Sequence, residues 1–171
     1  LCYVYAGGIG PFYKLQRWLI ALNQSQILIS AVFYIRRGDL SALEPKYKTI
    51  VLDSNIKIRH ESLPRVVSDD LHVGLLLLEP IEYIAIAVPL KFYSYLERGW
   101  PVLCYRDTAI GNIVDEFGLG WVIENSVESI TEFHHRQVSE SEYKGIQANI
   151  RKYIVKNQWG DRVQQIVEAT Q

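Results

Sequence analysis

Residues 89–102 read Pro89-Leu90-Lys91-Phe92-Tyr93-Ser94-Tyr95-Leu96-Glu97-Arg98-Gly99-Trp100-Pro101-Val102, and this stretch decides the fold. Its order predicts a short helix that begins at a proline, ends at a glycine and leads directly into a buried strand. Proline fits the first helical turn, where its missing N–H would have had no partner. Glycine fits the left-handed position just beyond a helix end. Lys91, Ser94 and Arg98 fall at i, i+3 and i+7, so we expect them to share one helical face.

The beginning of this predicted helix has the chemistry of an anion site. Unpaired backbone N–H groups and a partial positive charge gather at a helix N-terminus. Lys91 adds an ammonium to the first turn, and Ser94 adds a hydroxyl one turn later. An ordinary amphipathic helix that joins two strands fits the same pattern equally well.

The apolar residues elsewhere in the chain alternate between two kinds of pattern. Helical stripes cover residues 12–22, 63–71, 110–117 and 143–154, and a last short stripe lies at 163–167. Between the stripes, continuous apolar runs typical of buried parallel strands lie at residues 1–5, 27–35, 49–52, 73–78, 102–105 and 121–123. This alternation predicts an α/β fold, a doubly wound, Rossmann-like parallel sheet of about six strands with helices on both faces.

Composition narrows the classes of function. The 171 residues have a formal net charge of −1, so the broad basic surface that nucleic acids require is not predicted. The longest apolar runs are much too short to cross a bilayer. Two cysteines, Cys2 and Cys104, lie in strand-like runs and are expected to be reduced core thiols of a cytoplasmic protein. Because no cysteine, histidine or carboxylate cluster has ligand spacing, we predict no metal site.

The segment 89–102 resembles the donor-site helix and the following strand of GT-B glycosyltransferases, whose pattern is Pro-x-Lys-x-x-(Glu or Ser)-Tyr-Leu-x-x-Gly-x-Pro-Val. The version with serine is similar to bacterial galactofuranosyl- and glucosyltransferases, including those that extend sugars on serine-rich adhesins. The likeness continues in residues 63–70 and 73–76, ahead of the helix, and in residues 118–123, behind it. The resemblance implies the C-terminal half of a GT-B enzyme, which binds the nucleotide sugar.

This resemblance implies a function in the synthesis of bacterial polysaccharides or glycoproteins. Residues 1–171 would form a single donor domain that binds a nucleoside-diphosphate sugar, with UDP the expected nucleotide, and would need no cofactor. The acceptor, a glycan or glycoprotein, would meet an N-terminal domain of the same enzyme that this chain lacks. The enzyme would be cytoplasmic; association with the inner membrane face and with further copies of the chain are both open.

Two other functions share the fold. A non-catalytic GT-B-like subunit would hold an acceptor or a partner transferase and would not bind UDP. A nucleotide-sugar epimerase would need acid and base carboxylates around the sugar. The loop ahead of residue 89 offers only Glu79 and Glu82, which we expect to be solvated.

The site residues are expected in loops at the carboxyl ends of the strands, where ligands of open parallel sheets bind. Gly7 and Gly8 lie in the turn after the first strand, where glycine lets a diphosphate approach the backbone. The family places a basic residue in or just after this turn. Here Pro11 takes that place, so Lys14 or Arg17 would substitute.

Two further loops complete the predicted site. Residues Lys57, Ile58 and Arg59 follow the predicted third strand, and in the family the backbone there meets the nucleobase; a plain surface turn is the alternative. The last contacts come from the start of the signature helix, at Val88, Pro89, Leu90, Lys91 and Ser94.

The chain departs from many retaining relatives in one respect. They carry two glutamates eight positions apart, and here those places hold Ile86 and Ser94. A serine can hydrogen-bond a ribose hydroxyl but cannot supply a carboxylate. The sequence therefore does not assign a catalytic residue or a stereochemical outcome.

Overall fold

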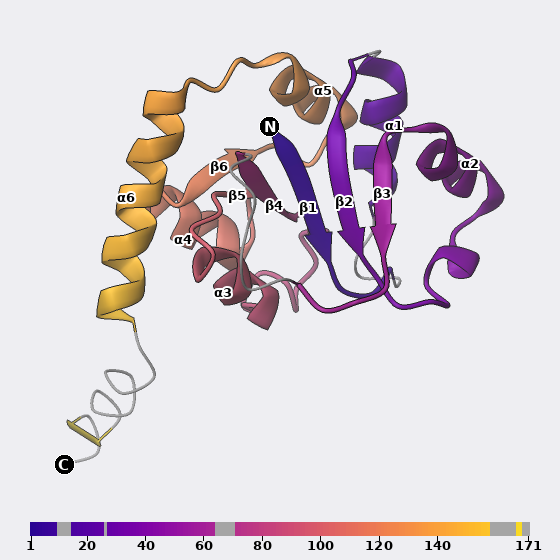
Figure 1. Cartoon of the computed structure of the whole chain (residues 1–171). Coiled ribbons are helices and arrows are strands. Elements are labelled where there is room, and N and C mark those ends of the chain that lie inside the picture. Colours follow the sequence, from indigo (N-terminus) through magenta and orange to yellow (C-terminus); the bar gives the residue numbers. More distant parts are fainter. Residues whose placement is uncertain (10–14, 26, 64–70, 158–166, 169–171) are drawn as a thin grey trace.

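The computed structural model describes residues 1–9, 15–25, 27–63, 71–157 and 167–168. Its centre is a six-stranded sheet in which every neighbouring pair is parallel, in the order β3-β2-β1-β4-β5-β6 (Figure 1). The predicted doubly wound sheet is thus confirmed. The strands are β1 (Cys2–Ala6), β2 (Ser30–Tyr34), β3 (Ile56–Arg59), β4 (His72–Leu76), β5 (Val102–Tyr105) and β6 (Gly120–Ile123).

Helices cover both faces of the sheet. The helical elements are α1 (Gln16–Ser25), a 3-10 turn η1 (Leu40–Ala42), α2 (Pro45–Asp53), α3 (Leu90–Leu96), α4 (Ala109–Phe117), α5 (Val127–His135) and α6 (Glu140–Lys156). One core cluster joins α1, α2 and α5 to the sheet, and the other joins α3, α4 and α6 to it. Successive strand residues point to opposite faces, so Tyr3 and Tyr5 belong to the first cluster and Val4 to the second.

The prediction of a strand at residues 49–52 was wrong. These residues lie in α2, which begins with Pro45 at its first position and buries Tyr47 and Val51, four residues apart. Leu52 is 62% exposed, as expected for a residue on the outer face of a helix. A four-residue apolar run fits a helix as well as a strand, and here the third strand is instead β3, seven residues downstream of the start of that run.

The signature stretch forms the predicted elements. Pro89 has an extended backbone and precedes α3, and Gly99 beyond the helix has a φ of 69°, in the left-handed region. The next helix, α4, ends at Gly118 with a φ of 60°. Its beginning is capped by the Thr108 hydroxyl, which accepts from the Gly111 N–H at 2.9 Å. These terminal residues direct each chain segment back onto the sheet.

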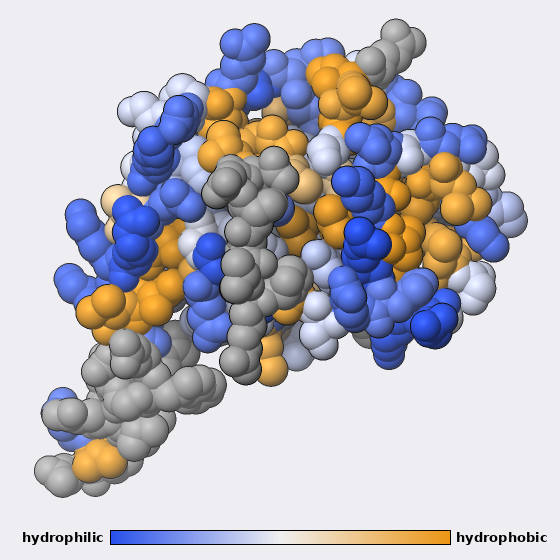
Figure 2. Space-filling view, in the orientation of Figure 1, coloured by the Kyte–Doolittle hydropathy of each residue, from blue (hydrophilic) through white to orange (hydrophobic). Residues whose placement is uncertain are grey.

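The surface is mixed. Cys2 and Cys104 are free and buried, as expected. Hydrophilic and hydrophobic side chains are interspersed over the face shown in Figure 2. Within the described ranges, no helix combines the length and the apolar character needed to cross a membrane.

Candidate functional site

The glycine turn after β1 meets the signature helix at the carboxyl edge of the sheet. Gly7 has a φ of 124°, and a Cβ atom at this residue would lie 3.2 Å from the Lys91 Nζ atom. The Gly7 N–H donates to the Tyr34 carbonyl at 3.0 Å, which fixes the start of the turn against the end of β2. The structure therefore brings Gly7 and Lys91 together, although 83 intervening residues separate them in the sequence.

Lys91 reaches inward rather than into open solvent. Its Nζ atom lies 4.8 Å from the centroid of the Tyr5 ring, in a cation–π arrangement. Burial lowers the pKa of Lys91 to about 8, because a low-dielectric surrounding disfavours the charged amine. An incoming anion would favour the ammonium and so raise this pKa again.

The second glycine of the turn lies beside Arg36, which follows β2. A Cβ atom at Gly8 would lie 2.6 Å from the Arg36 Nη2 atom, which is the far end of a flexible side chain that is 78% exposed. Arg36 is bound in turn by Asp39, with an Nη2–Oδ1 distance of 3.0 Å. Burial by itself would raise the pKa of Asp39, but the hydrogen bonds from Arg36 outweigh it and lower that pKa. The Gly8 carbonyl accepts from the Tyr5 hydroxyl at 2.6 Å, which holds the turn from below.

A second charged group lies at the same edge, between α1, β4 and β6. Arg17, in the first turn of α1, forms an ion pair with Glu79, which follows β4. Glu79 also accepts from the Asn125 Nδ2 atom at 3.2 Å, and its side chain is only 17% exposed. The expectation that Glu79 is solvated was therefore wrong. Its burial follows from the arginine and the amide, which satisfy the carboxylate oxygens.

The predicted α3 contacts divide between two surfaces. Lys91 lies at the glycine turn, whereas Val88, Leu90 and Ser94 line a groove of about 940 Å³. The opposite wall of this groove includes Tyr153 and Ile154 of α6. Pro89 connects the two surfaces as the residue just before α3. The expected single face of Lys91, Ser94 and Arg98 is thus split.

Arg98 has a structural role. Its guanidinium donates to the Ser94 carbonyl at 2.5 Å and to the Leu63 carbonyl at 3.3 Å. It also lies 5.8 Å from the centroid of the Trp100 ring. These contacts tie the end of α3 to the segment that precedes β4.

The predicted nucleobase loop is a strand. Lys57, Ile58 and Arg59 belong to β3, at the outer edge of the sheet, because the chain reaches this strand later than predicted. Arg59 is its last residue and pairs with Tyr34 of β2, at the carboxyl edge. Of the three residues, only Arg59 therefore lies at the carboxyl edge of the sheet, beside the end of β2. Lys14 lies outside the described residues.

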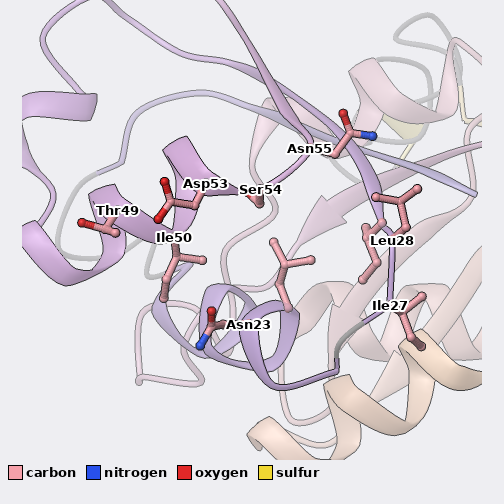
Figure 3. A pocket seen from close by; sticks show the side chains of 10 residues that line it. Asn23, Ile27, Leu28, Thr49, Ile50, Asp53, Ser54 and Asn55 are labelled. Carbon is pink, nitrogen blue, oxygen red and sulfur yellow. The ribbon is translucent and has the colours of Figure 1, made fainter.

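A second cavity lies at the opposite, amino-terminal edge of the sheet (Figure 3). It has a volume of about 380 Å³ and is lined by Asn23 and Leu28 near α1 and β2, and by Asp53 and Asn55 near α2 and β3. None of the predicted site residues lines it. Because ligands of this kind of sheet bind at the carboxyl edge, the rim at Gly7 and Lys91 is the better candidate.

The rim at Gly7, Gly8 and Lys91 offers the Lys91 ammonium and the Gly8 backbone amide for an anion, whereas the Gly7 N–H already donates to the Tyr34 carbonyl. Within the described part of the chain, no group of three or more His, Cys, Asp or Glu side chains lies close enough together to hold a metal ion. Sequence reasoning found the glycines and the lysine. It missed the hydroxyls of Tyr5 and Tyr95 and the side chain of Asn125, for which the chain gives no spacing signal.

Solved structures with the same fold span a range of sources. They include HepE from Anabaena in complex with UDP and glucose (TM-score 0.63, 11% identity, 99% of this chain and 47% of that chain). The N-terminal domain of trehalose-6-phosphate phosphatase from Candida albicans follows, with a TM-score of 0.60, 8% identity and coverage of 97% and 40%. Os79 from O. sativa, in complex with UDP and deoxynivalenol-3-glucoside, has a TM-score of 0.54, 11% identity and coverage of 91% and 37%. The chain spans less than half the length of each, and at these identities the likeness shows the fold.

The sequence itself supplies the family. No curated protein matches the chain significantly. Residues 77–170 match the family described as glucosyltransferase 3-like, C-terminal domain. This range contains α3 and every described element from β5 to α6. This match covers more than half of the chain. The protein therefore belongs to the glucosyltransferase 3-like family, whose C-terminal domain its residues 77–170 match.

Proposed function

We propose that the chain is the donor domain of a glycosyltransferase and binds a UDP-sugar at the rim formed by Gly7, Gly8 and Lys91. The observation that carries this proposal is the approach of the Lys91 ammonium to within 3.2 Å of the Cβ position of Gly7. A cation and the open backbone of a glycine turn at one point suit a diphosphate. Two proteins of the same fold, HepE and Os79, hold UDP in their crystal structures, which supports the choice of nucleotide.

The proposed chemistry is transfer of a sugar from UDP to an acceptor hydroxyl. As the glycosidic bond lengthens, negative charge develops on the bridging oxygen of the leaving diphosphate. Fixed positive groups aimed at that charge lower the barrier, and loss of one such contact typically costs roughly 10²-fold or more in turnover. Lys91 and the Gly8 backbone N–H would supply this stabilisation, the role that a divalent ion has in other transferases, because the Gly7 N–H already donates to the Tyr34 carbonyl.

The remaining predicted contacts have more peripheral roles in this proposal. Arg59 would meet the base from the end of β3, whereas Ser94 lines the separate groove between α3 and α6 and takes no part in this proposal. Arg17 is a candidate for a second phosphate contact, and it would have to leave Glu79 to make one. The acceptor and the general base would come from a further domain of the same cytoplasmic enzyme, so the domain by itself would bind donor but transfer little.

Calorimetric titration of UDP into the wild type and two lysine variants tests the proposal. We expect Lys91→Ala to weaken UDP binding at least tenfold, since it removes the cation that α3 places beside the glycine turn. Lys48→Ala, which removes an exposed lysine of α2, is the matched control and should bind like the wild type. Equal affinity of all three proteins would refute the assignment of Lys91. A wild type that binds neither UDP nor UDP-sugars would favour a non-catalytic subunit.

A further inference from the structure

Strands β1 and β4 separate before either of them ends. Their pairing runs from Cys2 opposite His72 to Val4 opposite Gly74, whereas β1 stays paired with β2 up to Ala6. The gap lies between β1 and β4. From this point the chain adds β2 and β3 on one side of the sheet and β5 and β6 on the other. In doubly wound sheets this switch point is where ligands enter between the strand ends.

The phenol of Tyr95 fills this gap and bridges the two strands. Its hydroxyl accepts from the Ala6 N–H at 2.9 Å and faces the Leu75 carbonyl at 3.4 Å. The side chain is fully buried. Because β1 and β4 no longer pair beyond Val4, the Ala6 N–H bonds to the Tyr95 side chain instead of to the backbone of β4. Without it, a buried backbone N–H would lack a partner, which proteins avoid.

The same residue belongs to the helix that carries Lys91. Tyr95 lies four residues after Lys91, one turn further along α3. Lys91 approaches Gly7, and Tyr95 binds Ala6, the residue immediately before it. Two adjacent turns of α3 are therefore joined to two adjacent residues at the end of β1. This pairing leaves little freedom for the helix to move relative to the glycine turn.

We propose that Tyr95 is a positioning residue of the donor site: its hydroxyl holds the end of β1 against α3, and so fixes the separation between the glycine turn and the Lys91 ammonium. The inference rests on the proposed function, since it assigns the hydroxyl a part in binding the same diphosphate. It predicts that loss of one oxygen atom, out of reach of the ligand, weakens binding by loosening the turn. If the hydroxyl had a merely structural role, its removal would lower the stability of the domain without a selective loss of UDP binding.

Tyr143 supplies a matched control. It is also buried, and its hydroxyl donates to the His72 carbonyl at 2.7 Å. His72 is the first residue of β4, at the amino edge of the sheet and remote from the glycine turn. Tyr95→Phe and Tyr143→Phe each remove one hydroxyl that bonds to the backbone of a central strand and keep the ring. Both variants should therefore fold, with similar decreases in Tm.

The experiment combines amide hydrogen exchange, followed by NMR, with UDP titration of the three proteins. In the wild type we expect the Ala6 amide to be protected. In Tyr95→Phe, exchange at Ala6 and Gly7 should accelerate at least tenfold relative to core amides such as that of Leu103, and UDP should bind at least fivefold more weakly. Tyr143→Phe should change neither quantity beyond what its lower global stability explains.

Each other outcome has a definite meaning. An unprotected Ala6 amide in the wild type would overturn the inference without any variant. Exchange and affinity in Tyr95→Phe that match those of Tyr143→Phe would also overturn it, as would faster exchange with unchanged affinity. If wild-type protein binds no UDP, the proposed function fails and the link to donor binding fails with it. The exchange data would then still decide whether the hydroxyl holds the turn.

Discussion

Tyr5 contacts both parts of the candidate site: its ring lies 4.8 Å from the Lys91 Nζ atom, and its hydroxyl donates to the Gly8 carbonyl at 2.6 Å. One β1 side chain thus supports the lysine of α3 and the turn that faces it. The ring face attracts the ammonium while its surroundings exclude water. This combination places a cation at the rim with a pKa that lies close to physiological pH.

The affinity for UDP should depend on pH through Lys91. Burial lowers the pKa of this amine to about 8 in the free protein, and a bound diphosphate would raise it. The dissociation constant should therefore be flat between pH 7 and 8 and rise above pH 8, by up to about tenfold per pH unit. Calorimetry in buffers of different ionisation enthalpy should show proton uptake on binding near pH 8. In Lys91→Met both the pH dependence and the proton uptake should vanish.

Lys91→Met should also make the domain more stable at pH 7. The folded-state pKa lies below the ordinary value of 10.5, so the unfolded chain holds the proton more tightly and the buried charge opposes folding. Wild-type stability should rise as the pH increases from about 8 to 10.5, and the variant should lack this rise. Chemical unfolding at pH 7 should show a gain on the order of 1 kcal/mol, since partial solvent access limits the effect. A loss of stability would contradict this reading.

Gly74→Ala should destabilise the domain strongly. A Cβ atom at this residue would lie 2.4 Å from the Tyr95 Cδ2 atom, and the buried ring cannot move aside without straining the core. We expect a cost of about 1–3 kcal/mol or more in unfolding free energy. Gly145→Ala is the control, because Gly145 lies in α6 with nothing within 4 Å of its Cβ position. That change should stabilise the helix by about 0.5–1 kcal/mol.

The acid branch of the stability profile should depend on His134. Burial, with a smaller contribution from His135, lowers the pKa of His134 to about 4. The unfolded chain therefore takes up a proton near pH 6.5, and stability falls as the pH decreases from there to about 4. In His134→Phe, which keeps an aromatic ring against Tyr3 and Trp18, this part of the fall should disappear. The exposed His135 serves as the control, since His135→Gln removes only the smaller contribution and should change the slope much less than His134→Phe does.

Most of the fold follows from the sequence because β1, β4 and β5 are buried along nearly their whole length. Continuous apolar runs identified β1, β4, β5 and β6, and the glycines at 99 and 118 marked where α3 and α4 end. β3 was misplaced because it lies at the sheet edge, where only alternate residues are covered. Half-buried and exposed residues alternate along β3, so its sequence contains no continuous apolar run that would predict a buried strand.

The candidate site was predictable only where a residue type has few other uses. Glycines beside a strand end and a lysine at a helix start gave Gly7, Gly8 and Lys91. Tyr95 was quoted in the signature but had no assigned role, since an apolar-facing tyrosine reads as core. Its hydroxyl contact to Ala6 spans 89 residues of sequence, and no local pattern reports a contact of that range. The ion pair between Arg17 and Glu79 could not be predicted for the same reason, because 62 positions separate the two residues in the sequence.

The close contact between Gly74 and the Tyr95 ring has an evolutionary consequence. The two residues share one volume, so neither can enlarge unless the other shrinks. Among relatives of this chain, those with alanine or a bulkier residue at the Gly74 position should have a residue other than tyrosine at the Tyr95 position. An alignment of many homologues should therefore show these two columns covarying, with the glycine–tyrosine combination inherited as a unit.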